Sequence, residues 1–370
     1  MTRPVRIGLI GCGSVAVGCY LPLLERLNLR HPAGEVAIAC DLNPDRAPHL
    51  KERFGITAFT TDPAEVLGNP AVELVLILTS MRDHGALARA ALEAGKHVLV
   101  EKPLATTLDE AASLLALDKT SPGHLVCAPH VMLSPTYQAI WRRLHRGEIG
   151  TVLTARGFYG WAGPSWGEWY YQPEGGALFD LGVYNVITLT GLLGPAKRVM
   201  AMSGVAIPER VVDGAMTAVR AHDNAQILLD FGAGVYAAIT TGFTIQKYRC
   251  PGIELYGTAG TIQMIGEDWA PRGYELWRNS DGYWQVYDDR GNWPWTDGLR
   301  DLIEAIQEDR PPVSNVEHAY HGLEIMIKAM ASGESGQAIA LDSTFQPLRF
   351  DLDASGAASA ETLHDPGRAE

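Results

Sequence analysis

A glycine-rich turn near the N-terminus constrains the fold of this chain more than any other stretch. The run VRIGLIGCGSVA places an apolar segment directly before a G-x-G-x-x-A pattern that begins at Gly11. The first glycine of such a pattern permits a tight turn, and the second lets backbone N–H groups approach a pyrophosphate. An ordinary strand-to-helix turn is the alternative interpretation. The spacing predicts a dinucleotide held at a helix N-terminus by Gly11, Gly13, Ser14 and Val15.

Composition narrows the class of protein. The 370 residues, 46% hydrophobic and 20% charged, are enough for two globular domains. A formal charge of -13 argues against a surface for nucleic acid or anionic membranes, because their phosphates attract positive charge. The five cysteines are scattered without a C-x-x-C pair, as is typical of a reducing compartment. With no signal-like start and no long apolar span, we expect a soluble, unprocessed cytoplasmic protein without metal, nucleic-acid or membrane partners.

The first third of the chain alternates between apolar segments and helical patterns. We expect strands at 36–40, near Ala58, and at 72–78, 97–100 and 125–127. We expect helices at 15–27, 44–54, 83–94 and 108–118, with a helical turn from Pro63. The run VELVLIL suits a strand that is buried on both faces of a parallel sheet. The alternation predicts an α/β domain with a doubly wound parallel sheet over residues 1–128.

A different pattern begins at Ser134. A helix is expected from there to Arg146, followed by longer alternating runs that look antiparallel, at 151–159, 199–206, 225–231 and 235–243. Gly232-Ala233-Gly234 is a predicted hairpin turn between the last two runs. We expect a second domain over 129–350, with helices 297–308 and 316–331 returning to brace the first. The small, polar, aperiodic segment 351–370 is a predicted flexible tail.

Asp41 follows the second predicted strand. An acidic residue there accepts hydrogen bonds from the adenosine ribose hydroxyls and repels a 2′-phosphate. Its separation from Gly13 exceeds the usual value of roughly 20 residues, and a polar insertion at 28–34 accounts for most of the excess. These residues favour NAD over NADP, while Arg46 leaves a contact with a 2′-phosphate open. Asp41 also suits a simple turn or helix cap.

Glu101 and Lys102 stand directly after the predicted strand 97–100. The carboxyl ends of parallel strands open onto the cofactor crevice, so we expect Lys102 to point toward whatever lies over the nicotinamide. Glu101 and Lys102 could pair with each other. A solvated charge pair that ends the strand before a proline is the alternative.

The stretch EGGALFDLGVYNV carries the second group of candidate residues. Asp180 and Tyr184 lie four residues apart, on one face of a helix if it begins near Ala177. Oxidation of a sugar alcohol requires removal of the hydroxyl proton, and a phenol can accept it if an ammonium group lowers its pKa from about 10. Lys102 is the candidate ammonium, and Asp180 would orient a substrate hydroxyl. A core tyrosine and a first-turn helix charge are the alternatives.

The segment FYGWAGPSWGEWYYQ concentrates aromatic residues that could stack on a sugar or on nicotinamide. Trp166 is a candidate substrate contact, although core or subunit-interface packing explains most such rings. Arg156 and His130 are further candidate substrate contacts. Their alternatives are a charge on a strand surface and an internally hydrogen-bonded histidine.

Four features occur in order along the chain: the glycine turn, E-K-P at 101–103, G-E-I-G at 147–150, and the stretch 175–184 with its D-x-x-x-Y spacing from Asp180 to Tyr184. Together they resemble the Gfo/Idh/MocA oxidoreductase family over roughly residues 4–342. The resemblance implies a Rossmann domain followed by an α/β domain with a large open antiparallel sheet. It also implies NAD or NADP, sugar or cyclitol substrates, and a homodimer or homotetramer formed through that sheet.

By position, Lys102 is similar to the family's motif lysine, Asp180 to its substrate-orienting acid, and Tyr184 to its acid/base residue. Many members have histidine at this last position, so the chain resembles the tyrosine-type members. Further cofactor contacts implied by the resemblance are Glu101, Thr79 and His84. The run TSMRDHG departs from the usual T-P-x-x-x-H, because Ser80-Met81 stands at the proline position.

The leading interpretation is an NAD-dependent oxidoreductase that acts on a sugar or glycoside hydroxyl, with Tyr184 as acid/base and Lys102 assisting. A second class is an NAD-dependent glycoside hydrolase that oxidises its substrate transiently, eliminates the aglycone, adds water and reduces back. A third is a non-enzymatic dinucleotide-sensing regulator. Retention of Lys102, Asp180 and Tyr184 together argues against the regulator.

Overall fold

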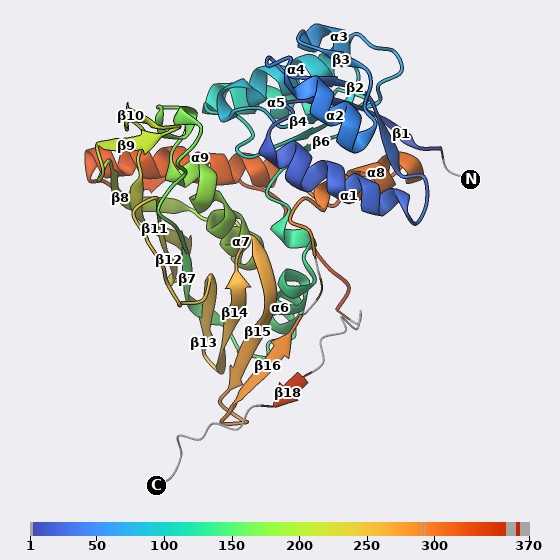
Figure 1. The fold of residues 1–370 in the computed structure, drawn as a ribbon. Helices are drawn as coiled ribbons and strands as arrows, with labels where there is room; N and C mark the ends of the chain where they lie inside the picture. The colour runs from blue at the N-terminus through green and yellow to red at the C-terminus, as the bar shows by residue number, and fades with distance from the viewer. Residues whose placement is uncertain (1–2, 290, 292, 353–359, 363–370) are drawn as a thin grey trace. The chain divides into compact units, whose positions relative to one another are not determined.

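The computed structural model describes residues 3–289, 291, 293–352 and 360–362 and divides into two compact units (Figure 1). Unit 1 consists of residues 1–130 and 294–320, and unit 2 consists of residues 131–293 and 321–370. Both units are therefore discontinuous in sequence, because the chain returns to each of them once.

Unit 1 contains a parallel sheet of six described strands in the order β3-β2-β1-β4-β5-β6. The strands are β1 Val5–Ile10, β2 Gly34–Cys40, β3 Phe59–Thr60, β4 Leu74–Ile77, β5 His97–Val100 and β6 Leu125–Cys127. Every residue of β4 is buried, as the aliphatic run predicts for a strand covered on both faces. The chain leaves β1 toward β2 and later returns to β4 on its other side, which confirms the doubly wound Rossmann topology.

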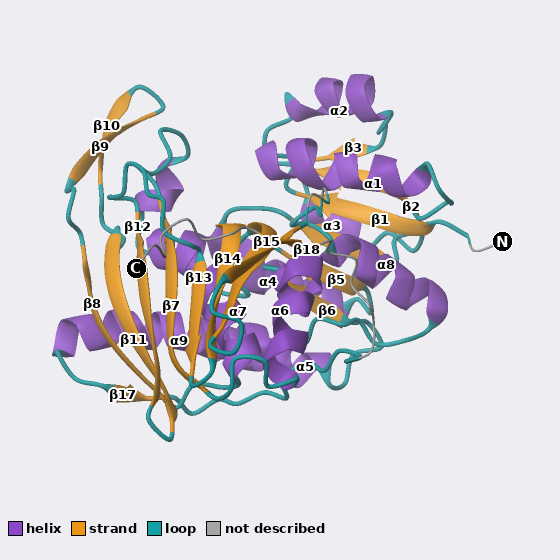
Figure 2. Ribbon diagram, turned by 90° about the horizontal axis from the view of Figure 1, so that it is seen from below, coloured by secondary structure: helices purple, strands orange, loops and turns teal. Residues whose placement is uncertain are grey.

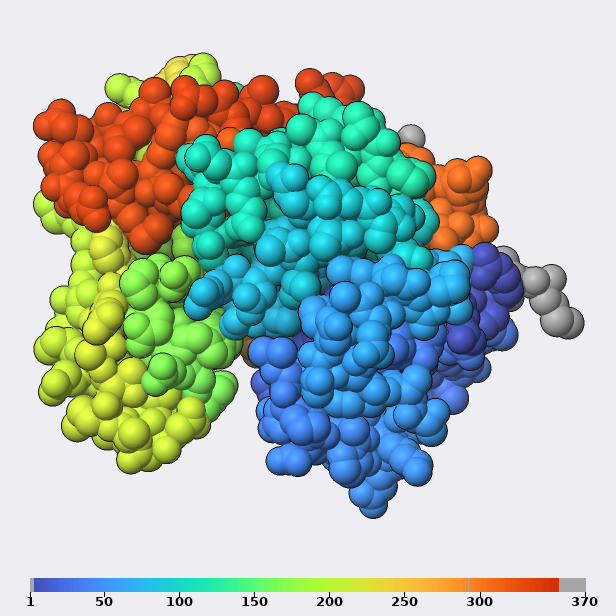
Figure 3. All heavy atoms as spheres, turned by 90° about the horizontal axis from the view of Figure 1, so that it is seen from above, coloured from blue at the N-terminus to red at the C-terminus, as the bar shows by residue number. Residues whose placement is uncertain are grey.

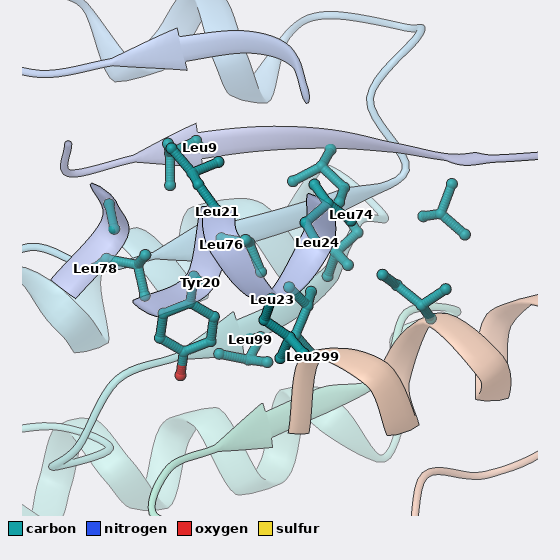
Figure 4. Packing of buried hydrophobic residues seen from close by; sticks show 14 of the residues in the cluster. Leu9, Tyr20, Leu21, Leu23, Leu24, Leu74, Leu76, Leu78, Leu99 and Leu299 are labelled. Carbon is teal, nitrogen blue, oxygen red and sulfur yellow. The ribbon is translucent and has the colours of Figure 1, made fainter. Parts of the chain in front are cut away.

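The helices of unit 1 are α1 Leu21–Asn28, α2 Arg46–Phe54, α3 Pro63–Leu67, α4 His84–Glu93, α5 Leu108–Asp118 and α8 Gly298–Glu308. A π-helical turn, η1 (Ala16–Tyr20), precedes α1, and a 3-10 turn, η2 (Met81–Asp83), precedes α4. Helix α8 brings Leu299 into the buried cluster that also holds Leu23 of α1 and Leu99 of β5 (Figure 4). The late segment of the chain thus completes the core of unit 1.

The large sheet of unit 2 has ten described strands in the order β17-β8-β11-β12-β7-β13-β14-β15-β16-β18 (Figure 2). Its strands are β7 Val152–Gly160, β8 Arg198–Gly204, β11 Asn224–Gly232, β12 Val235–Gly242, β13 Ile253–Gly257, β14 Gly260–Glu267, β15 Ala270–Arg278, β16 Trp284–Asp288, β17 Ile339–Ala340 and β18 Ala360–Thr362. A separate hairpin, β9 Glu209–Val212 with β10 Ala215–Ala218, lies at the surface (Figure 3, yellow-green).

One strand pair corrects the antiparallel expectation. Strands β11 and β12 form the predicted antiparallel hairpin, but β12 and β7 run parallel, so the sheet is mixed. Parallel neighbours need a crossover connection, and the chain between β7 and β12 supplies one because it passes through a helix and two further strands of the sheet. The predicted fold class is otherwise confirmed.

The helices of unit 2 are α6 Pro135–His145, α7 Val183–Leu193 and most of α9 Val316–Ser335. Short turns are η3 Val131–Leu133, η4 Glu168–Tyr171 and the π-helical η5 Leu178–Gly182. Helix α7 packs on β7 and β12, and α6 packs on β15. No helix in the described part of the chain combines the length and apolar character needed to cross a bilayer.

The tail predicted at 351–370 lies largely outside the described residues. Within it, the three residues Ala360–Thr362 form β18, which pairs antiparallel with β16. The predicted helix 316–331 is longer in the structure, where α9 extends to Ser335 and crosses the division between the two units.

Candidate functional site

The glycine turn of unit 1 requires glycine at its first position. Gly11 has a φ of 92°, and its N–H donates to the carbonyl oxygen of Cys40 at 2.9 Å. A Cβ on Gly11 would lie 2.6 Å from the carbonyl oxygen of Leu78. A side chain at this position is therefore excluded both by the left-handed backbone and by the neighbouring strand end.

The second glycine leaves room for a ligand. A Cβ on Gly13 would meet no heavy atom within 4 Å, so the turn opens onto free space there. The N–H of Val17 donates to the carbonyl of Gly13 at 3.1 Å, so the N–H groups ahead of it, including those of Ser14 and Val15, belong to the unpaired first turn of the helix. That turn contains no acidic residue. Open space and free N–H groups at a positive helix end fit a pyrophosphate.

Asp41 lies beside this turn, as the sequence predicts. One carboxylate oxygen accepts from the backbone N–H of Cys12 at 2.8 Å and the other from that of Asn43 at 2.9 Å. The carboxylate is thus fixed at the end of β2, where it can accept further bonds from ribose hydroxyls. Arg46, the first residue of α2, is exposed.

Glu101 is held by a residue that the sequence does not single out. The Tyr20 hydroxyl donates to one oxygen of the Glu101 carboxylate at 2.8 Å, and the backbone N–H of Lys102 donates to the other at 3.1 Å. Tyr20 is fully buried, and its hydroxyl lies at the margin of the leucine cluster (Figure 4). Nothing in its sequence position distinguishes Tyr20 from an ordinary core aromatic. In the structure, the Tyr20 hydroxyl fixes the Glu101 carboxylate next to Lys102.

His84 braces the loops around Lys102. It is buried, with Nδ1 2.8 Å from the carbonyl of Pro103 and Nε2 3.2 Å from that of Thr79. Burial lowers the pKa of His84, while the two carbonyl contacts raise it, and the shorter contact marks Nδ1 as the better placed N–H donor. Ser80 has φ -66° and ψ 153°, a backbone conformation that proline can also adopt.

His130, a predicted substrate contact, is enclosed inside unit 1. Its side chain is fully buried, and neither ring nitrogen has a hydrogen-bond partner. A Cβ on Gly298 would lie 2.2 Å from the ring, so the imidazole packs directly on the first residue of α8. Burial lowers the pKa of His130 to about 4.

In unit 2, a second glycine turn leads to Asp180 and Tyr184. Gly176 has a φ of 99°, and a Cβ on Gly175 would lie 2.4 Å from the carbonyl of Trp169. The α-helix expected from Ala177 is instead the π-turn η5 over 178–182, with α7 beginning at 183, because the backbone bonds there reach one residue further. Asp180 is partly buried within η5, and Tyr184 is only 7% exposed in the first turn of α7.

Tyr159 of β7 connects these two residues. Its ring packs edge-on against Tyr184, with ring centroids 5.8 Å apart. Burial and the Asp180 carboxylate raise the pKa of Tyr159, which keeps this phenol neutral. Because successive side chains of β7 point to opposite faces of the sheet, Tyr159 lies on the face that α7 covers. The sequence does not indicate that the ring of Tyr159 packs on Tyr184.

Most aromatic rings of the segment 158–172 form a core. Trp161, Tyr170 and Tyr171 each pack edge-on against Phe243. Trp166 is the exception, since it is 50% exposed and lies 5.8 Å from Trp161, centroid to centroid. The packing alternative therefore holds for most of the segment, and Trp166 remains at the surface.

Arg156 is not brought together with Asp180 and Tyr184. Its neighbours Ala155 and Gly157 are buried on the face that α7 covers, and successive strand residues point to opposite faces. Arg156 therefore lies on the outer face, 56% exposed, with its guanidinium 3.3 Å from the carboxylate of Glu254.

The described residues contain no cluster of His, Cys, Asp or Glu suited to a metal ion. All five cysteines are free. Burial raises the pKa of Cys12 to about 12 and that of Cys40 to about 11, so both remain protonated thiols next to the glycine turn.

Comparisons with known proteins define the class. Residues 5–126 match the model described as oxidoreductase family, NAD-binding Rossmann fold, which makes unit 1 the NAD-binding domain of an oxidoreductase. Residues 137–263 match the GFO/IDH/MocA C-terminal domain. The chain belongs to the GFO/IDH/MocA family, which confirms the resemblance and the expected cofactor.

Relatives cover nearly the whole chain. The 1,5-anhydro-D-fructose reductase of Ensifer adhaerens is 28% identical over 348 residues, 91% of this chain and 99% of the relative. The scyllo-inositol 2-dehydrogenase (NAD(+)) of Bacillus subtilis is 26% identical over 92% of this chain and 98% of its own length. The structure of levoglucosan dehydrogenase with NADH and levoglucosan has a TM-score of 0.80 at 21% identity, over 92% of this chain and 100% of that one, and shows the same fold.

Proposed function

We propose that the protein is an NAD-dependent dehydrogenase that oxidises a hydroxyl-bearing carbon of a sugar or glycoside. The observation that carries the proposal is the arrangement of Asp180 and Tyr184 around the neutral Tyr159, where a glycine turn leads into α7. Related enzymes named for a sugar derivative and for an inositol support the substrate class.

The proposed roles follow from the chemistry of each side chain. Bound NAD supplies the hydride acceptor. The Tyr184 phenol takes the proton of the substrate hydroxyl, and the Lys102 ammonium favours its ionised form, because a nearby positive charge lowers the pKa of a phenol. Asp180 accepts a hydrogen bond from a second substrate hydroxyl and so fixes the sugar ring. Glu101 and His84 hold the loop that carries Lys102.

For the cofactor we propose a preference for NAD over NADP. The Asp41 carboxylate is fixed by two backbone N–H groups at the end of β2. A fixed negative charge at this point accepts bonds from both ribose hydroxyls and repels a 2′-phosphate. If the protein instead prefers NADP, the exposed Arg46 is the residue expected to contact the 2′-phosphate.

A second candidate function is the redox-neutral glycoside hydrolase. Trp166 favours it, because this half-exposed ring next to Trp161 could stack on an aglycone. A simple dehydrogenase of free sugars has less need of such a surface.

We also propose that the chain forms a homodimer or homotetramer through the outer face of the large sheet. The residues Met200, Met202, Leu228 and Tyr236 are between 41% and 79% exposed there. Strand register places Met200 opposite Leu228, so the apolar side chains are neighbours. A contiguous apolar surface of this kind is costly to leave in water, and a second copy would cover it.

One assay separates the candidate functions. The enzyme is incubated with NAD and a panel of free sugars, cyclitols and chromogenic glycosides while NADH absorbance and aglycone release are recorded together. Stoichiometric NADH without aglycone supports the dehydrogenase. NAD-dependent aglycone release without NADH supports the hydrolase, and NAD binding with no turnover supports a sensor. A Lys102→Met variant that binds NAD but keeps full activity would remove Lys102 from the mechanism.

A further inference from the structure

A buried carboxylate lies beneath the helix that carries Tyr184. Asp268, in the turn between β14 and β15, is 1% exposed. One of its oxygens accepts from the Asn185 side-chain amide at 2.9 Å, and the other accepts from the Thr188 hydroxyl at 2.6 Å. Both donors belong to α7, and Asn185 directly follows Tyr184 in the chain.

The backbone of the sheet reaches the same point of α7. A Cβ on Gly157 of β7 would lie 2.9 Å from the Cβ of Asn185, so glycine is what lets strand and helix approach this closely. The Asn185 amide also lies 3.3 Å from the carbonyl of Gly252, where a Cβ would in turn lie 2.9 Å from the backbone nitrogen of Asp268. Three segments of unit 2 therefore converge on Asn185.

Two hydrogen bonds to the Asp268 carboxylate fix the position of α7 more firmly than one hydrogen bond could. Asn185 and Thr188 are three residues apart and so occupy the same face of α7. The packing of α7 on the sheet already limits its rotation; a single bond adds a restraint in one direction, whereas two donors on one acceptor oppose rotation in both directions. Side chains end about 5–6 Å from a helix axis. A rotation of about 10° therefore shifts such a tip by about 1 Å, which is enough to cost up to about 100-fold in rate.

Burying the Asp268 carboxylate costs free energy, which argues that this residue has a specific role. Burial raises the pKa of Asp268 to about 7, while the bonds from Thr188 and Asn185 lower it. Apolar residues of similar volume would stabilise the same contact without that cost. What the carboxylate supplies in return is the attachment of α7 at two points.

Resting on the proposed function, we propose that Asp268 is a positioning residue that fixes the rotation of α7, and with it the placement of Tyr184 over the substrate. It touches neither substrate nor cofactor and acts through Asn185 and Thr188. The Tyr184 phenol thereby sits on a helix that is held at the next residue, Asn185, and one turn further along, at Thr188.

The kinetic test uses Asp268→Ala, Asp268→Asn and Thr188→Val. We expect Asp268→Ala to lower kcat about 10- to 100-fold with an unchanged KM for NAD, because unit 1 is untouched. Thr188→Val removes one of the two bonds and should give a smaller loss. Asp268→Asn should recover part of the activity, because its amide can donate to the Asn185 side-chain oxygen, which has no partner in the structure.

Glu148→Gln is the matched control. Glu148 is another largely buried carboxylate of unit 2, with its ion pair to Arg143 at 2.9 Å, and neither residue belongs to α7. Its loss should lower the melting temperature without changing kcat. If Glu148→Gln and Asp268→Ala lower kcat equally at matched stability, the effect is general loosening and the proposal is overturned.

A second readout does not depend on turnover. We would place 3-fluorotyrosine at position 184 and record its ¹⁹F resonance in the folded protein. Asp268→Ala should shift or broaden that resonance, and Glu148→Gln should leave it unchanged. An unchanged resonance together with kcat within twofold of wild type would overturn the proposal. If the resonance responds but Tyr184→Phe keeps full activity, the positioning holds while the proposed function fails.

Discussion

The two units use the same backbone device at their candidate sites. In unit 1, Gly11 at φ 92° leads through the π-turn η1 into α1, and in unit 2, Gly176 at φ 99° leads through the π-turn η5 into α7. Each glycine turn contains a residue whose Cβ would lie within 2.6 Å of a backbone carbonyl oxygen, Gly11 in the first and Gly175 in the second.

The two glycine turns lead to different chemical groups. The first turn of η1 contains no acidic residue and presents main-chain N–H groups, whereas η5 contains Asp180 and leads directly to Tyr184. We propose that the turn in unit 1 binds the cofactor through its backbone, whereas the turn in unit 2 presents side chains. Side-chain changes should therefore affect chemistry in unit 2, while in unit 1 the changes that matter most are those that add a Cβ.

The largest effect should come from removing the phenol in unit 2. We expect Tyr184→Phe to lower kcat about 10²- to 10⁴-fold, the usual range for a general acid/base. NAD affinity, measured by calorimetry, should stay within about twofold because the cofactor domain is intact. A variant that kept wild-type kcat would weaken the contrast between the units, since the phenol that follows the second turn would then take no part in the chemistry.

A matched pair of alanines tests the backbone role in unit 1. Gly11→Ala forces a positive φ and a contact with Leu78, so we expect a loss of about 1–3 kcal/mol in unfolding free energy, measured by urea denaturation. Gly13→Ala meets no atom of the protein and should leave stability unchanged. It should still weaken NAD binding about tenfold or more, because its methyl group occupies the space that the pyrophosphate needs. Equal effects of the two variants would contradict this division of roles.

Asp41 is a side chain beside the first glycine turn that we expect to act on the ligand directly. Asp41→Asn removes the charge, and also one of the two bonds from backbone N–H groups, so the ratio of kcat/KM for NAD over NADP should fall about tenfold. Parallel assays with both cofactors measure this ratio. Should the ratio not change, discrimination lies elsewhere, and Arg46→Ala is the next variant to measure.

The smallest expected difference between the two units concerns their buried histidines. The pKa of His130 in unit 1 and that of His321 in unit 2 are both lowered to about 4 by burial. His130 has no hydrogen-bond partner, whereas the N–H of Ala196 donates to His321 Nε2 at 3.1 Å. At pH 7 we therefore expect His130→Leu to change stability by less than about 1 kcal/mol, and His321→Leu to cost about 1–3 kcal/mol.

The two histidines also predict a pH dependence. Since the unfolded groups take up protons near pH 6.5 and the folded ones only near 4, wild-type stability should fall as the pH drops through this window. Each histidine contributes at most about 3 kcal/mol. His130→Leu should flatten the curve, as measured by chemical denaturation at several pH values. If the stability of the variant changes with pH in parallel with that of wild type, His130 takes up its proton as readily in the folded protein as in the unfolded chain.

The sequence predicted the elements whose signals are local. Strands 97–100 and 125–127 and helix 108–118 begin and end where expected, because aliphatic runs and helical periodicity mark them; in the structure the Thr107 side chain caps that helix. Asp41 lies beside the glycine turn because a βαβ unit places the two strand ends together.

Features that depend on distant partners were not predictable. The parallel pairing of β7 with β12 depends on which strand arrives beside β7 some 70 or more residues later. The π-turns differ from α-helical turns only in which carbonyl oxygen accepts each N–H bond. The periodicity of the side chains along the sequence hardly changes with that difference. The bond from Tyr20 to Glu101 likewise follows from packing between remote segments.

The return of α8 to unit 1 has a consequence for how the chain is made. Leu299, Leu302 and Ile303 complete a core whose other members precede residue 127. During synthesis, N-terminal domains generally begin to fold first, at about 5–20 residues per second. The nascent NAD domain must therefore wait roughly ten to thirty seconds with part of its leucine surface uncovered. A gene truncated after β6 would leave that surface exposed permanently, so a shortened cofactor domain should aggregate unless α8 is supplied in trans.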